Sequence, residues 1–278
     1  MTLSEIIEEI VQSTSQMTQG EGAEDLSPST ELCSTLMPDG ARCNAPVERF
    51  TEKSFDGIEY AYVKRCKKCH SAWNEYNALS WMDPSEQASD SLRKAIERRL
   101  DIPVQKTEEN SYARDVLRDV VKGGGRDLSA MLGGPTGTGK TFLALHCLMA
   151  CIRKHNISGL YAPEHILVKA YKASHDYQNP SRSDWGHRFL SAAKTKKLLV
   201  LDDFGQNRNV SEGCLDAIEQ IIMYRYDAGL QIICTTNRNP QGLVQDRGQR
   251  VMSRLREMAR DKFVVMSGED WRGKNGEE

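Results

Sequence analysis

The 278-residue chain lacks the features of several large classes of protein. It has no uninterrupted apolar run near the roughly 18 residues that a membrane-spanning helix needs. Its first helix-like segment is acidic where a secretory signal peptide would be basic. The net charge is only −2, with 39% hydrophobic and 27% charged residues, which excludes a wholly disordered chain and a uniformly basic nucleic-acid coat. We therefore expect a cytoplasmic protein with no membrane partner.

The chain also shows no internal repeat, and its length allows one large domain or two unequal ones. Eight cysteines are present, and a reducing cytosol disfavours disulfides, so each is expected to be a packing residue or a metal ligand. Four of them are scattered without ligand spacing, and we predict that these pack in the core: Cys147, Cys151, Cys214 and Cys234.

The other four cysteines have the spacing C-x9-C-x22-C-x2-C and are Cys33, Cys43, Cys66 and Cys69. A tetrahedral structural zinc site uses four such thiolates, and a turn at 38–40 would bring the first pair together. We predict a zinc site, with buried cysteines without metal as the other interpretation and His70 as an alternative ligand. Cys66–His70 also spells a c-type haem attachment string, but nothing in the chain predicts the export that haem attachment requires.

Changes in composition divide the chain into four predicted segments. An amphipathic helix and a polar linker occupy 1–30, the zinc-binding domain 31–82, a linker helix 83–104 and a larger domain 105–278. All charged residues before position 42 are acidic, which favours a protein partner over DNA for this part of the chain.

Within the larger domain, helical patterns alternate with short apolar runs, which lie at 128–132, 159–162, 197–201 and 230–235. Such alternation is typical of strands joined by crossover helices. We therefore predict an α/β fold with a parallel sheet flanked by helices.

A phosphate-binding loop follows the first of these runs and precedes a helical stretch, as the motif G-x-x-x-x-G-K-[ST] requires. Its residues are Gly134, Pro135, Thr136, Gly137, Thr138, Gly139, Lys140 and Thr141. Successive backbone N–H groups of such a loop surround phosphates at a helix N-terminus. The motif predicts that Lys140 reaches the β- and γ-phosphates of ATP and that Thr141 binds Mg²⁺.

Acidic and polar residues follow two later strands of the predicted sheet. Asp202 and Asp203 end the run at 197–201, which is typical of a Walker B element. We predict that Asp202 holds Mg²⁺ and that Asp203 orients or deprotonates the attacking water. The next strand ends in Thr-Thr followed by Asn237, whose side chain would lie beside the γ-phosphate.

Walker A, an Asp-Asp Walker B and a strand ending Thr-Thr-Asn in this order resemble an AAA+ ATPase, and the resemblance makes Asn237 sensor 1. Most AAA+ proteins carry Glu where Asp203 stands, so we expect slow hydrolysis. A late Ser-Arg-Leu stretch resembles the family's arginine finger, with Arg254 as the finger and Arg250 as the runner-up. A finger acts on a neighbour's ATP, which implies a helical or ring oligomer. Arg225 resembles another recurrent basic position of the subfamily.

Only 24 residues follow Arg254, too few for the helical lid of most AAA+ proteins. Lidless proteins with these motifs are similar to the DnaC/DnaI-type replicative helicase loaders and to IstB-type transposition ATPases. The resemblance covers about 101–273, including Ile102-Pro103 and a closing segment at 268–272. A zinc module ahead of the ATPase favours the loaders, and the resemblance implies a hexameric replicative helicase as partner. The alternatives are an IstB-like regulator that recruits a transposase and a nucleotide-switched interaction protein with negligible turnover.

Basic and aromatic residues are mixed between the two Walker motifs, which suits single-stranded DNA binding, although solvated helix faces look similar. The cations are Lys169, Lys172, Arg182, Arg188, Lys194, Lys196 and Lys197, and the aromatic residues are Tyr171, Tyr177 and Trp185. Several arginines around the finger are compatible with a solvated basic helix face: Arg247, Arg250, Arg254, Arg256 and Arg260.

Overall fold

The computed structural model describes residues 37, 41, 43, 49–53, 59–63, 67–79, 108–123, 129–207, 210–260, 262–268 and 270. The predicted helix near the amino terminus, the predicted linker helix and two of the four predicted zinc ligands, Cys33 and Cys66, lie outside these residues. No helix within the described part of the chain is both long and apolar enough to cross a membrane.

A five-stranded parallel sheet forms the centre of the larger domain, in the order β4-β5-β6-β3-β7. Its strands are β3 (Ala130–Gly133), β4 (Gly159–Pro163), β5 (Leu198–Asp202), β6 (Gln231–Thr236) and β7 (Phe263–Val265). Each of the four predicted apolar runs contributes one strand. The three-residue edge strand β7 has no such run and was not predicted. The predicted α/β fold class is confirmed.

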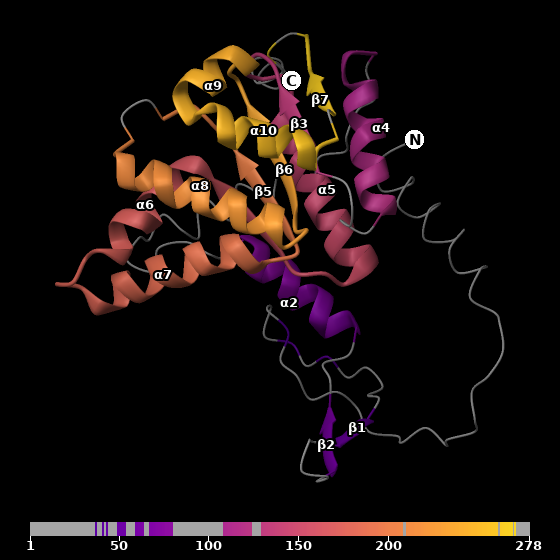
Figure 1. Cartoon of the computed structure of the whole chain (residues 1–278). Coiled ribbons are helices and arrows are strands. Elements are labelled where there is room, and N and C mark those ends of the chain that lie inside the picture. Colours follow the sequence, from indigo (N-terminus) through magenta and orange to yellow (C-terminus); the bar gives the residue numbers. More distant parts are fainter. Residues whose placement is uncertain are drawn as a thin grey trace, which may run out of the picture.

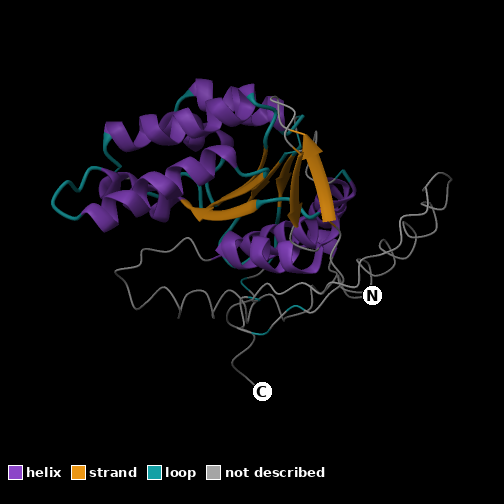
Figure 2. Ribbon diagram, turned by 90° about the horizontal axis from the view of Figure 1, so that it is seen from below, coloured by secondary structure: helices purple, strands orange, loops and turns teal. Residues whose placement is uncertain are grey.

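Helices cover both faces of the sheet, as Figures 1 and 2 show. One face packs against α4 (Glu108–Lys122) and α5 (Lys140–His155). The other face packs against α6 (Glu164–Ser174), α7 (Pro180–Thr195), α8 (Glu212–Asp227), α9 (Pro240–Arg247) and α10 (Gln249–Met258). With helices on both faces, β3, β5 and β6 are buried at every position, which explains why they read as continuous apolar runs.

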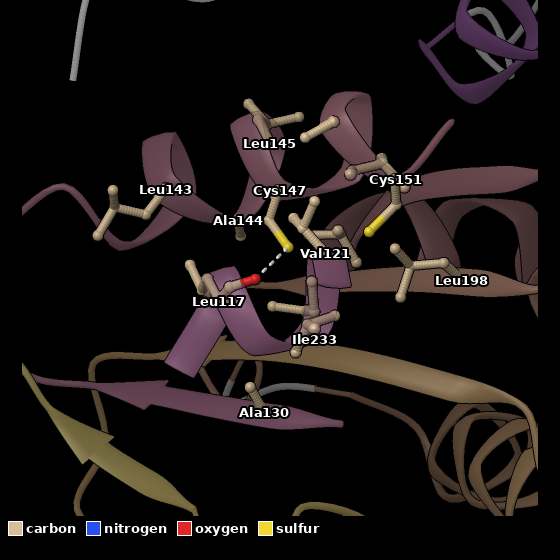
Figure 3. Packing of buried hydrophobic residues seen from close by; sticks show 14 of the residues in the cluster. Leu117, Val121, Ala130, Leu143, Ala144, Leu145, Cys147, Cys151, Leu198 and Ile233 are labelled. Atoms are coloured by element: carbon tan, nitrogen blue, oxygen red, sulfur yellow. Dashed lines mark hydrogen bonds between the residues drawn. The ribbon is translucent and has the colours of Figure 1, made fainter. Parts of the chain in front are cut away.

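The cysteines of the larger domain are packing residues, as predicted. Cys147 and Cys151 lie one turn apart on α5 and are buried among residues of α4 and the sheet (Figure 3). The thiol of Cys147 donates to the backbone carbonyl of Leu117 at 3.6 Å. Cys214 and Cys234 are also fully buried.

The described amino-terminal elements are an antiparallel pair and one helix. Strand β1 (Arg49–Lys53) pairs with β2 (Glu59–Val63), and α2 (Lys67–Leu79) follows. Helix α2 packs against α5 and β4, and Ala78 and Leu79 at its end belong to the same hydrophobic cluster as α5. An ion pair of 2.9 Å joins Glu75 to Arg153 of α5. Helix α2, which the predicted boundaries place in the zinc-binding domain, is thus packed on the core of the larger domain.

Candidate nucleotide-binding site

The predicted phosphate-binding loop connects β3 to α5. From β3 the chain crosses to the far edge of the sheet at β4, while β7 lies on the other side of β3. Ligands of open parallel sheets bind where neighbouring connections diverge in this way, at the carboxyl ends of the strands. The loop, the end of β5 and the end of β6 all lie at this edge.

Glycines give the loop a conformation that other residues rarely adopt. Gly134, Gly137 and Gly139 have φ angles of 136°, 83° and 87°. A side chain at Gly134 would meet the carbonyl oxygen of Met266 at 2.1 Å, and one at Gly137 would meet the carboxylate of Asp270 at 1.9 Å. The chain after β7 therefore runs along the loop, and this close approach requires glycine at both positions.

Lys140 is the first residue of α5 and is 5% exposed. Its ammonium group donates to the carbonyls of Gly134 and Pro135 at 2.9 and 2.6 Å. Thr138 donates to the same Pro135 carbonyl at 3.0 Å. The loop thus holds the lysine side chain within its own curve, next to the backbone N–H groups at the start of α5.

Asp202 at the end of β5 lies at the centre of the site and is 3% exposed. Thr141 of the phosphate loop donates to one of its oxygens at 2.8 Å. Thr235 of β6 donates to the same oxygen, and Tyr161 of β4 donates to the other at 2.7 Å. The structure thus brings the predicted Walker A hydroxyl and Walker B carboxylate together. The sequence offered no sign of Tyr161, because its contact depends on the pairing of β4 with β5.

Asp203 has a φ angle of 54°, in the left-handed region that residues with a Cβ seldom occupy. Thr235 holds it there from the neighbouring strand. The threonine hydroxyl accepts the Asp203 N–H at 3.0 Å, and the Thr235 carbonyl accepts the Phe204 N–H at 2.8 Å. Strained backbone of this kind persists where the surroundings hold it, often at functional sites.

Asn237 follows β6 directly and is half-buried. Because β6 lies between β5 and β3, this residue is at the same edge of the sheet as Asp202 and the phosphate loop. The predicted residues of the nucleotide site therefore converge, although they are drawn from three separate parts of the sequence.

The two candidate finger arginines lie on α10 and point to acidic partners of their own chain. Arg254 bonds Glu257 at 2.9 Å and stacks 4.5 Å from the ring centre of Tyr226. Hydrogen bonds from Tyr226 and Arg254 lower the pKa of Glu257. Arg250 is more exposed, at 74% of its side chain, and pairs with Glu219 at 3.3 Å.

Arg225 is fully enclosed rather than part of a binding surface. Its guanidinium donates to five backbone carbonyls at the end of α7 and the starts of β5 and β6, which belong to Ala193, Lys194, Lys196, Lys197 and Gln231. Burial lowers the pKa of Arg225 to about 9, so the group remains charged at pH 7. Arg225 therefore joins α7, β5 and β6 to α8 inside the domain.

Two parts of the predicted basic and aromatic surfaces are wrong. Trp185 is 7% exposed and packs with its ring 5.8 Å from that of Phe189, so it cannot stack on a base. Arg247 is not on a solvated helix face, because its side chain is 5% exposed and paired with Glu164. Tyr177 is 84% exposed at the turn between α6 and α7, the hairpin that projects from the domain in Figure 1.

Two of the predicted zinc ligands are described, and both are buried. Cys69 is inaccessible near the start of α2, and Cys43 is 8% exposed. Among the described residues, no three candidate ligand side chains lie together. This search did not include Cys33 or Cys66, and the His70 side chain is not described.

No family model and no curated protein matches the sequence. Solved structures do match. The DnaC helicase loader is 26% identical, with a TM-score of 0.54 over 63% of this chain and 99% of that one. DnaI is 22% identical, with a TM-score of 0.50 over 64% and 92% of the two chains. A DNA replication initiation factor is 21% identical, with a TM-score of 0.50 over 59% and 48%. The larger domain has the AAA+ P-loop fold.

Proposed function

We propose that this protein binds and hydrolyses ATP with Mg²⁺ at the phosphate loop. The observation that carries the proposal is the contact between the Thr141 hydroxyl and the Asp202 carboxylate, at 2.8 Å beside that loop. Hydroxyl and carboxylate oxygens are ligands that suit Mg²⁺, so these two residues fit the ion. When bound, Mg²⁺ would neutralise charge on the phosphates and make the γ-phosphorus more open to attack.

The other site residues divide the remaining work. Lys140 and the backbone N–H groups of the phosphate loop bind the phosphates, Asp203 orients the attacking water and Asn237 contacts the γ-phosphate. The aspartate is one methylene shorter than the usual glutamate, so turnover is slow. Arg254 completes the site of the neighbouring subunit in an oligomer, with Arg250 as the second candidate.

Lys140→Ala and Arg254→Ala test this assignment together. Lys140→Ala removes the ammonium group that faces the phosphates, so we expect nucleotide binding to fall at least 100-fold in a fluorescent-nucleotide titration. Arg254→Ala should keep that affinity and lose most DNA-stimulated phosphate release. Undiminished release by Arg254→Ala, with release lost in Arg250→Ala, would transfer the finger role to Arg250.

We infer further that the ATPase acts as a helicase loader in replication initiation. Support comes from the match to nearly the whole solved DnaC helicase loader. The chain also has residues ahead of α4, where the AAA+ domain begins, and these could bind a helicase. In this proposal the amino-terminal part binds a hexameric replicative helicase, and the ATPase domains grip single-stranded DNA. ATP binding favours the gripping state, and hydrolysis releases it.

Affinity purification from a host that expresses the tagged chain tests the loader proposal. We expect a hexameric replicative helicase in the eluate of the full-length protein and its absence when residues 1–66 are removed. Recovery of a transposase without the helicase would instead support the IstB-like function. The truncated chain keeps α2, so that loss of helicase binding is not a result of an exposed core.

The four amino-terminal cysteines are proposed to bind structural Zn²⁺. Two observations fit this, since Cys43 and Cys69 are both buried and neither forms a disulfide. Metal analysis of the purified chain should find one Zn²⁺ per subunit, and Cys66→Ser should lower the content. Cys214→Ser is the matched control, because that cysteine is buried in the ATPase core. A folded wild-type chain without metal would refute the zinc site.

A further inference from the structure

A buried ion pair contacts the loop that follows β5, residues 203–207, which we call the Walker B loop. Glu164 is the first residue of α6 and Arg247 the last residue of α9, and their side chains are 0% and 5% exposed. The guanidinium bonds one glutamate oxygen through two nitrogens, Nη2 at 2.7 Å and Nε at 2.9 Å. Two residues 83 positions apart in the sequence are thus joined in the core.

This pair holds the loop that follows Asp203. The Glu164 carboxylate accepts the N–H of Gly205 at 3.3 Å and that of Asn207 at 3.2 Å, and the Asn207 side chain adds a third bond at 3.1 Å. Arg247 donates to the Asn207 carbonyl at 3.0 Å and lies 5.7 Å from the ring centre of Phe204. The path of the chain leaving Asp203 is therefore set by two charged side chains.

Asp246, which precedes Arg247 on α9, is bound to the residue pair that follows β6. Asp246 accepts from Arg238, which directly follows Asn237, with Nε at 2.9 Å. The Arg238 N–H also bonds the Thr236 hydroxyl at 3.0 Å, and that hydroxyl donates to the Phe204 carbonyl at 2.7 Å. Two adjacent residues of α9 thus connect the ends of β5 and β6.

The end of α9 also leads into α10, the helix that carries the candidate finger arginine. Gly248, with a φ angle of 85°, follows Arg247 and caps both α9 and α10. Helix α10 begins one residue later. A displacement of the Walker B loop would therefore reach Gly248 through Arg247, and Gly248 directly precedes α10.

We propose that Glu164 and Arg247 are positioning residues for ATP hydrolysis, which hold the Walker B loop so that Asp203 faces the attacking water and which couple this loop to α10. The inference rests on the proposed ATPase function. Stability alone does not explain the pair, since well-packed apolar residues often replace a buried ion pair without loss of stability. The directed bonds to the loop provide what apolar residues would not, namely a defined position for its backbone.

The test compares Arg247→Met, Glu164→Gln and the double variant Glu164→Leu/Arg247→Met with wild type. We expect kcat to fall at least tenfold, since misplacement by 1 Å can cost about 100-fold. The nucleotide Kd, measured separately with a fluorescent analogue, should change less than threefold, because no phosphate-loop residue is altered. Arg118→Met on α4 is the control, since it removes an exposed ion pair far along the chain from the loop.

The split between kcat and Kd, with kcat counted per nucleotide-binding site, distinguishes positioning from a structural role, because unfolded molecules lower the number of binding sites and not the turnover of the folded ones. The double variant adds a second safeguard, since it leaves no unpaired buried charge. Turnover near that of wild type in the folded double variant would overturn the inference. Absence of turnover in wild type itself would instead refute the proposed function, and this inference with it.

Mixed oligomers test the coupling between the Walker B loop and α10. Subunits with Lys140→Ala are expected to bind nucleotide at least 100-fold more weakly but still present Arg254 to a wild-type neighbour. Adding Arg247→Met to those subunits should reduce the phosphate release of the wild-type neighbours further, whereas adding Arg118→Met should not. Equal rates in the two mixtures would overturn the coupling part of the inference.

Discussion

At the scale of single residues, Asp202 is placed by three hydroxyl donors from three different elements. Thr141, Thr235 and Tyr161 converge on one carboxylate that is almost inaccessible to solvent. Hydrogen bonds to a charged group are stronger than those between neutral groups, so this arrangement keeps the carboxylate in one orientation. Only the threonines belong to motifs that the sequence displays.

Tyr161→Phe removes one of these donors and leaves the ring in place. We expect a loss of about 1.5 kcal/mol in the free energy of unfolding, since the carboxylate loses one hydrogen bond. Mg²⁺-dependent ATP affinity should also weaken several-fold. Urea denaturation and nucleotide titration measure the two effects, with Tyr112→Phe as the control because Tyr112 is 61% exposed on α4. Identical values for both variants would contradict the role given to Tyr161.

At the scale of secondary-structure elements, Arg225 joins α8 to the end of α7 and the starts of β5 and β6. Five backbone carbonyls meet at its guanidinium, and that of Lys197 also accepts the Gln231 N–H of the neighbouring strand. Buried carbonyls must be paired, so one side chain provides donors where α7 ends and β5 and β6 begin.

Arg225→Met should lower the free energy of unfolding by about 3 to 5 kcal/mol, because it leaves several buried carbonyls without a donor. Urea denaturation measures the loss. Arg188→Met on α7 is the matched control, since Arg188 forms an exposed ion pair, which contributes under about 1 kcal/mol. A loss under 1 kcal/mol in Arg225→Met would show that water or other groups donate to these carbonyls in place of Arg225.

The α6–α7 hairpin separates two aromatic residues that the sequence alone did not distinguish. Tyr177→Ala should weaken single-stranded DNA binding, with a cost of about 1 to 3 kcal/mol if one base stacks on the ring, and leave stability unchanged. Trp185→Ala should instead destabilise the fold by about 3 to 5 kcal/mol. Fluorescence anisotropy with a labelled oligonucleotide and thermal melts check the two. DNA affinity unaffected by Tyr177→Ala would remove the hairpin turn from the proposed DNA surface.

At the scale of the whole molecule, helix α2 and the AAA+ domain share a core. Helix α2 ends in the hydrophobic cluster that contains α4 and α5, and its Glu75 pairs with Arg153. Helix α2 thus contacts α5, whose first turn carries Lys140 and Thr141. The two parts are thus connected through packing as well as along the chain.

Leu79→Ala tests this packing. Leu79 is 6% exposed, and loss of a buried leucine side chain costs about 2 to 5 kcal/mol. We expect a lower melting temperature for the transition that also releases bound nucleotide. Glu75→Ala, which removes only the partly exposed ion pair, should lower the melting temperature much less. An unchanged melting temperature for this transition in Leu79→Ala would mean that α2 contributes nothing to the core of the AAA+ domain.

The sequence by itself determined the α/β class, four of the five strands of the parallel sheet and the residues of the phosphate loop. Phosphate binding depends on glycine conformations and on a strand-loop-helix order that are local, so their signals lie close together in the chain. The tertiary structure alone decided which neighbours each side chain meets. It placed Tyr161 on Asp202, Glu164 on Arg247 and Trp185 in the core, because burial and pairing arise from contacts between residues tens of positions apart.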